Sequence, residues 1–95
     1  MPGTNIQAIR ITLFGRVQGV GFRDYALKKA LNLNIGGYVK NQNDGSVLVV
    51  AEGAQPALDE YQTVLSKGPL MARVESIEAD RLQPTGTYRE FKIHY

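Results

Sequence analysis

A glycine-bearing loop between a strand pattern and a helix pattern constrains this chain more than any other feature. Residues 6–14 alternate between apolar and polar side chains, which predicts a half-buried strand, and a helical pattern begins near Phe22. Between them, Gly19 and Gly21 can adopt positive φ and allow a ligand to approach the backbone closely. Because the first N–H groups of a helix are unpaired and lie at the positive end of its dipole, such a loop attracts an anion.

Arg23 extends this prediction to a phosphate site, since its guanidinium is planar, permanently charged and matched to phosphoryl oxygens. A glycine-rich turn before a helix often serves only as a tight connection, and the glycine spacing alone favours that alternative. The nucleotide motifs do not fit. Phe22 and Arg23 stand where a Walker loop needs Lys and then Ser or Thr, and Asp24 replaces the third glycine of the dinucleotide fingerprint.

The rest of the chain predicts a regular order of elements. Expected strands cover residues 6–14, 38–42, 46–52, 72–82 and 89–94, and expected helices begin near Phe22 and Pro56. Asn34 and Gly36–Gly37 are expected to end the first helix, and Asp44–Gly45 predicts a hairpin turn. This order predicts an α+β, ferredoxin-like split βαβ fold with a short terminal strand: one mixed sheet with both helices on one face. We expect one domain over residues 6–95, after a flexible tail at residues 1–5.

The expected topology brings two distant segments together. A helix crossover makes the first two strands parallel, and the third strand, which is apolar on both faces over residues 47–50, fills the gap between them. The carboxyl ends of the first two strands then lie at the same edge, about 10 Å apart. Asn41, near the end of the second strand, is therefore expected to lie close to the loop. An asparagine beside a hairpin usually bonds the backbone of the turn, and this alternative stays open for Asn41.

The composition limits the chemistry. The 95 residues include no cysteine, which excludes thiol catalysis. Their formal net charge of +2 is small and gives little reason to expect nucleic-acid or membrane partners. The chain shows neither a run of transmembrane length nor a signal peptide, so we expect a cytoplasmic protein. The candidate site has no histidine, cysteine or carboxylate cluster, and we expect neither a metal site nor a strong general acid. Asp24 and Asp44 are expected to serve in capping and turns, and His94 to face solvent.

A site without a general acid can hydrolyse only a phosphoryl compound whose leaving group departs unprotonated. A carboxylate qualifies, because its conjugate acid has a pKa of about 4 to 5, whereas an alcohol does not. Phosphoryl transfer has a loose transition state, so positioning and charge stabilisation supply most of the catalysis. The residues at the candidate site therefore suit a phosphoryl compound with a carboxylate leaving group better than one with an alcohol leaving group.

The string Gly-Arg-Val-Gln-Gly-Val-Gly-Phe-Arg, at residues 15–23, closely resembles the signature of the acylphosphatase family. A second match, Gly-Tyr-Val-Lys-Asn at residues 37–41, continues to Asp44–Gly45 and has Tyr38 where the family often has tryptophan. The resemblance extends over nearly the whole chain. It implies an enzyme that hydrolyses acyl phosphates to a carboxylate and inorganic phosphate, with no cofactor.

The resemblance also implies roles for single residues. Arg23 would bind the phosphate, and Asn41 would position the attacking water. The loop would hold the phosphate, with backbone contacts at residues 18–22, and the expected binding residues are Gly15, Gln18, Gly19, Val20, Gly21 and Phe22. Nothing in the sequence requires more than a monomer.

Two other functions fit the expected fold. The first is a noncatalytic module that binds anions or RNA, but RNA-recognition motifs stack bases on aromatic residues of their central strands, and residues 47–50 contain none. The second is an accessory domain, since acylphosphatase-like domains also begin larger hydrogenase-maturation proteins. The absence of zinc-finger cysteines from this 95-residue chain favours the enzyme.

Overall fold

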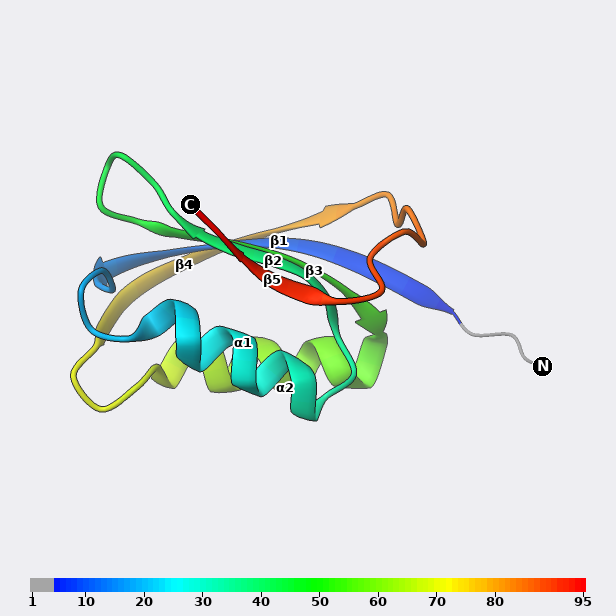
Figure 1. Ribbon diagram of the computed structural model, residues 1–95, viewed down its shortest axis with the longest axis horizontal. Helices are drawn as coiled ribbons and strands as arrows, with labels where there is room; N and C mark the ends of the chain where they lie inside the picture. The colour runs from blue at the N-terminus through cyan, green and yellow to red at the C-terminus, as the bar shows by residue number, and fades with distance from the viewer. Residues whose placement is uncertain (1–4) are drawn as a thin grey trace.

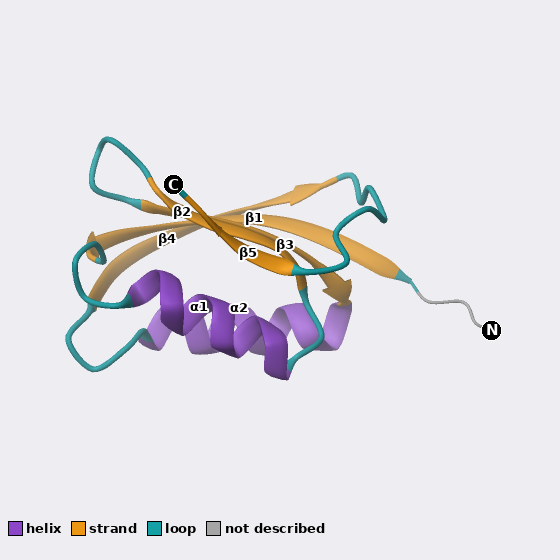
Figure 2. Ribbon diagram, in the orientation of Figure 1, coloured by secondary structure: helices purple, strands orange, loops and turns teal. Residues whose placement is uncertain are grey.

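The protein forms one five-stranded sheet with both helices packed against the same face (Figures 1 and 2). The computed structural model describes residues 5–95, so all of the predicted tail except Asn5 lies outside the described residues. In chain order the elements are β1 (Ile6–Arg16), α1 (Phe22–Asn32), β2 (Gly36–Asn41), β3 (Val47–Ala54), α2 (Gln55–Lys67), β4 (Arg73–Leu82) and β5 (Phe91–His94). In the described part of the chain, no helix is long and apolar enough to cross a membrane.

The strand order in the sheet is β4-β1-β3-β2-β5. β3 pairs antiparallel with both β1 and β2, so β1 and β2 are parallel to each other and their carboxyl ends lie at one edge. β4 is antiparallel to β1, and β5 is parallel to β2. This arrangement confirms the predicted ferredoxin-like fold and the central position of β3.

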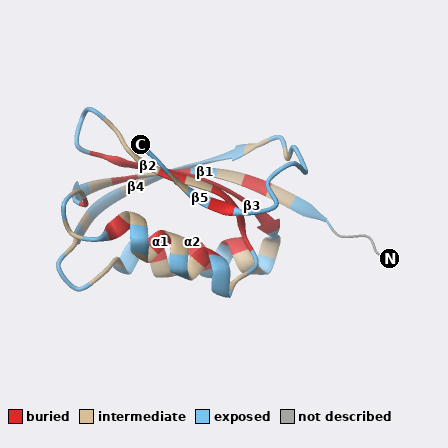
Figure 3. Cartoon of the chain, in the orientation of Figure 1, coloured by how far each residue is buried: buried red, intermediate tan, exposed pale blue. Residues whose placement is uncertain are grey.

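The hydrophobic core lies between the sheet and the two helices, where the buried segments of Figure 3 face each other. α1 covers β2 and β5, and α2 covers β1, β3 and β4. The predicted apolar row of α2, Leu58, Tyr61 and Leu65, is fully buried. The Tyr61 hydroxyl donates a 2.9 Å hydrogen bond to the Ala26 carbonyl and so joins the two helices, and burial raises the pKa of this phenol.

The structure extends β1 beyond the predicted end at residue 14, through a bulge. Pairing with β4 shifts register between Phe14 and Gly15, and Gly15 has φ 124°. A side chain at Gly15 would collide with the Arg73 carbonyl of β4, so this glycine allows the two strands to stay together through the bulge. The end of the first helix also differs from the prediction, which placed it at Asn34 and Gly36–Gly37. Asn34 alone supplies the left-handed residue after α1, with φ 56°, and Gly36–Gly37 belong to β2.

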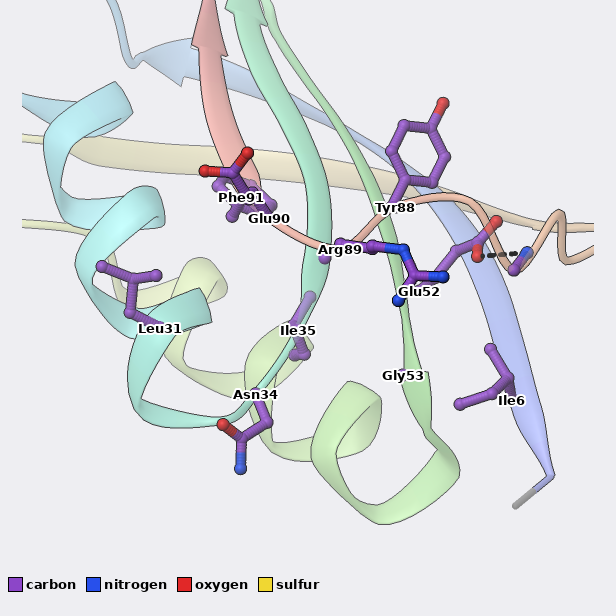
Figure 4. Close-up of a pocket in the computed structure, with 12 residues that line it drawn as sticks. Ile6, Leu31, Asn34, Ile35, Glu52, Gly53, Tyr88, Arg89, Glu90 and Phe91 are labelled. Atoms are coloured by element: carbon purple, nitrogen blue, oxygen red, sulfur yellow. Dashed lines mark hydrogen bonds between the residues drawn. The ribbon is translucent and has the colours of Figure 1, made fainter. Parts of the chain in front are cut away.

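At the end of the sheet where β2 begins, a buried carboxylate holds the loop that joins β4 to β5 (Figure 4). Glu52 accepts hydrogen bonds from the Thr85 N–H and hydroxyl at 2.8 Å each, and from the Gly86 N–H at 3.0 Å. The cavity beside it, of about 320 Å³, is lined in part by Ile35 and Phe91. These partners satisfy both oxygens of Glu52, and its role here is to hold the loop.

Candidate active site

The loop between β1 and α1 presents unpaired donors, as predicted. Gly21 forms the N-cap of α1 in the left-handed conformation, with φ 80° and no side-chain hydrogen bond to the helix. The first helical bond there runs from the Tyr25 N–H to the Gly21 carbonyl, at 3.1 Å. Within residues 5–95, the backbone N–H groups of residues 18–22 have no protein acceptor. These donors, together with the positive end of the α1 dipole, can bind a phosphoryl group.

A cavity of about 330 Å³ joins this loop to the end of β2. Its lining residues are Val17, Gly19, Gly21, Phe22, Arg23, Asp24, Asn41, Ile93 and Tyr95. The structure therefore brings together five of the predicted site residues, and it does so through the predicted parallel arrangement of β1 and β2. Three predicted residues, Gly15, Gln18 and Val20, do not line the cavity.

The three predicted residues outside the cavity have other contacts. Gly15 lies against β4 in the bulge, and Val20 packs against the core. The Gln18 side chain extends to the β2–β3 hairpin, where its Nε2 donates to the Gln42 carbonyl at 2.7 Å and to the Ser46 carbonyl at 2.9 Å. Of these three, Gln18 and Val20 still have backbone N–H groups without a protein acceptor among residues 5–95.

Asn41 lines the cavity and carries an unpaired polar atom. It is the last residue of β2, and its Oδ1 is buried without a hydrogen-bond partner among the described residues. The turn is served by Asp44 instead, whose Oδ1 accepts from the Ser46 N–H at 2.9 Å and from the Ser46 hydroxyl. The alternative that Asn41 serves the hairpin is therefore not what the structure shows. A buried acceptor left unpaired costs about 1–3 kcal/mol, so this oxygen is the polar atom near the cavity with most to gain from a hydrogen bond to a water or ligand.

Arg23 has no ion-pair partner among residues 5–95. It occupies the first turn of α1, and its guanidinium lies 5.0 Å from the centre of the Tyr95 ring. The neighbouring carboxylate, Asp24, is paired with Lys28 at 3.1 Å rather than with Arg23. The charge of Arg23 is therefore available to an anion in the cavity, and the exposed Tyr95 ring adds a cation–π contact beside it.

Asp44, in the hairpin that follows Asn41, does not serve as a general acid. Hydrogen bonds from the Ser46 hydroxyl, and then from its N–H, lower the pKa of Asp44, so this group is ionised at neutral pH. In the described part of the chain, no group of three or more His, Cys, Asp or Glu side chains is placed to hold a metal ion. His94 lies away from the cavity, exposed and stacked on Tyr38 with ring centres 4.3 Å apart, in agreement with its predicted solvent-facing position.

Four lining residues were not among the predicted site residues: Val17 and Asp24 beside the loop and, in and just after β5, Ile93 and Tyr95. The last two come from a distant part of the chain. Both follow Phe91 at intervals of two, and the pairing of β5 with β2 places this row on the helix-facing side of the sheet beside Val39. The alternation of residues 91, 93 and 95 was visible in the sequence. Their nearness to Arg23 depended on the parallel pairing of β5 at the β2 edge, which no local pattern specifies.

Comparisons with known proteins show which family the chain resembles. The acylphosphatase family model matches residues 9–93. An acylphosphatase of Mannheimia succiniciproducens is 40% identical over 90% of this chain and 96% of its own length, and one of Thermus thermophilus is 55% identical over 67% of this chain and 73% of its own length. The crystal structure of the Bacillus subtilis acylphosphatase superposes with a TM-score of 0.91 at 34% identity, over 94% of this chain and 99% of that one. The chain described here belongs to the acylphosphatase family.

Proposed function

We propose that this chain hydrolyses acyl phosphates in the cavity between the β1–α1 loop and Asn41. Membership of the acylphosphatase family makes the chain a hydrolase whose substrate is an acyl phosphate and whose product is inorganic phosphate. The observation that carries the assignment of the site is that one cavity holds both donors for a phosphoryl group and an acceptor for a water. Unpaired N–H donors and the Arg23 guanidinium suit phosphoryl oxygens, and the unpaired Asn41 Oδ1 suits the hydrogen of a water.

In this proposal the loop and Arg23 hold the phosphoryl group. The N–H groups of residues 18–22 donate to its oxygens, and Arg23 supplies the positive charge that stabilises the transition state. Gly19 and Gly21 shape the loop so that these donors converge, and Gly15 supports it from the bulge of β1. These contacts are retained throughout the reaction, so they serve binding as well as catalysis.

Asn41 positions the attacking water. Its Oδ1 accepts a hydrogen bond from the water and directs the water's oxygen at phosphorus, in line with the bond that breaks. The P–O bond to the acyl group breaks, and the electron pair leaves with the carboxylate. Because the conjugate acid of that leaving group has a pKa of about 4 to 5, no side chain has to protonate it.

We also propose that the domain acts without further components. Residues 6–95 act as one domain that works as a monomer in the cytoplasm, without a cofactor and without nucleic-acid or membrane partners. The alternative of a noncatalytic RNA-binding module is not favoured. The middle of β3 carries no aromatic residue, and the aromatic pair nearby, Tyr38 and His94, stack on each other.

The choice of leaving group tests the proposal. The chain should hydrolyse a synthetic aryl acyl phosphate and show negligible turnover of an alkyl phosphate monoester, because the monoester needs an acid to protonate its alkoxide. Release of inorganic phosphate from both compounds is the measurement. Comparable rates on the two classes would show that an acid has been missed, and turnover of neither would leave only a binding module.

A further inference from the structure

The Gln18 side chain forms a direct link between the two halves of the site. Its Nε2 donates to the carbonyls of Gln42, at 2.7 Å, and of Ser46, at 2.9 Å. Because both partners are acceptors, the amide must present its NH₂ group to them, and its orientation follows from the hydrogen bonds alone. Among residues 5–95, no other side chain hydrogen-bonds the 17–21 loop to the β2–β3 hairpin. We call this pair of hydrogen bonds the Gln18 clamp.

The same two carbonyls close the hairpin turn. The Gln42 N–H donates to the Ser46 carbonyl at 2.9 Å, and the Gly45 N–H donates to the Gln42 carbonyl at 3.1 Å. Each oxygen therefore accepts one hydrogen bond from the turn and a second from Gln18. A single NH₂ group can reach both only when the turn is closed, so the clamp fixes both the shape of the hairpin and its distance from the loop.

The hairpin's other polar contacts do not reach the loop. The Gln42 amide donates to the Ser46 hydroxyl at 2.9 Å, and Asp44 accepts from Ser46. These bonds make the turn rigid within itself, and the clamp then attaches this rigid turn to the phosphate loop. Gln42 directly follows Asn41 in the chain, so a shift of the turn moves the backbone that carries Asn41.

We propose that Gln18 is a positioning residue, whose clamp sets the distance between the phosphate loop and Asn41 and so aligns the attacking water with the phosphoryl group. The catalytic part of this inference rests on the proposed function. Residue spacing in a site of this kind matters because an error of about 1 Å can reduce a rate about 10²-fold. Gln18 acts on the reaction through Asn41 and not through a side-chain contact with substrate.

The main test replaces Gln18 with methionine, which keeps the length of the side chain and removes its donors. We expect kcat to fall about ten- to a hundredfold while KM and the dissociation constant for inorganic phosphate change by less than about threefold. Gln18→Glu should be as slow, because its carboxylate would face the same two carbonyls. Gln55→Met is the matched control, since Gln55 bonds Asp59 at 2.7 Å on α2 and does not line the cavity.

A double-mutant cycle separates alignment from general stability. If the clamp acts through the water at Asn41, then Gln18→Met should lower kcat by less than about twofold in an Asn41→Ala background. Additive losses would overturn the proposal, because Gln18 would then act independently of Asn41. A lower melting temperature with unchanged kcat, or a loss of phosphate affinity that matches the loss of kcat, would overturn it as well.

Hydrogen exchange tests the clamp without any substrate. The amides of Gln42 and Gly45, which donate to the two clamped carbonyls, should exchange faster in Gln18→Met than in the wild type and in Gln55→Met. Unchanged exchange would show that the clamp does not hold the turn. If the wild-type chain fails to hydrolyse acyl phosphates, the proposed function fails and the role in alignment fails with it, while the exchange rates still decide whether the physical link exists.

Discussion

At the scale of single residues, Arg23 and Asn41 act on different partners. Arg23 contacts phosphoryl oxygens in the ground state and in the transition state, so Arg23→Ala should weaken phosphate binding and reduce turnover together. Arg23→Lys should restore little, because a point ammonium cannot reproduce the planar fork of the guanidinium. Calorimetry with inorganic phosphate, run beside kcat, measures both effects. Full activity in Arg23→Lys would show that only the charge matters.

Asn41 contacts the water, which phosphate binding does not need. Asn41→Ala should therefore keep phosphate affinity nearly unchanged and lower kcat about 10²-fold, the scale of losing one oriented polar group in an active site. Circular dichroism serves as the folding control, since Asn41 ends an element and its Oδ1 holds no structural hydrogen bond. A folded variant with wild-type kcat, or with phosphate binding lost as severely as in Arg23→Ala, would contradict the water-positioning role.

At the scale of elements, the loop between β4 and β5 depends on one buried side chain. Glu52 is 5% exposed, and three donors of Thr85 and Gly86 surround its carboxylate. Glu52→Gln would turn an NH₂ group towards these donors, so we expect a loss of about 1–3 kcal/mol in the free energy of unfolding. The site lies at the other end of the sheet, so kcat should stay at the wild-type value. Denaturant unfolding and steady-state kinetics measure the two quantities, and a large loss of kcat in the folded variant would contradict this separation.

The elements themselves could be predicted from the sequence because their patterns are local. The alternation of apolar and polar residues predicted β1, and the apolar row Leu58, Tyr61 and Leu65 predicted α2. The dipeptide Asp44–Gly45 predicted the hairpin. The end of β1 could not be predicted, because a glycine at residue 15 ordinarily ends a strand. The pairing of β1 with β4 continues past Gly15 through a bulge, and this depends on the position of the β4 backbone, which the local sequence does not specify.

The predicted site shows the same division between local and distant contacts. The loop, Arg23 and Asn41 could be placed together because two parallel strands bring their carboxyl ends to one edge. The side chain of Gln18 could not be assigned, since its partners at Gln42 and Ser46 come from a hairpin more than twenty residues away. Side-chain hydrogen bonds across such distances depend on the finished packing, and no sequence pattern specifies them.

At the scale of the whole molecule, we expect the enzyme to work without a metal ion. The described residues offer a guanidinium and backbone donors for the phosphate, and no group of metal-ligating side chains. Activity should therefore survive exhaustive chelation, and inorganic phosphate should inhibit competitively because it occupies the same donors. A loss of activity with EDTA that magnesium or zinc restores would overturn the metal-free mechanism.

The unpaired oxygen of Asn41 has a consequence for how the sequence can change. No described protein group pairs with this oxygen, so an apolar residue of similar size at this position would break no hydrogen bond of the fold but would leave the protein without a way to direct water. Selection for thermal stability alone would therefore not keep Asn41, whereas selection for turnover would. The identity of this residue follows from what the protein does and not from how it folds.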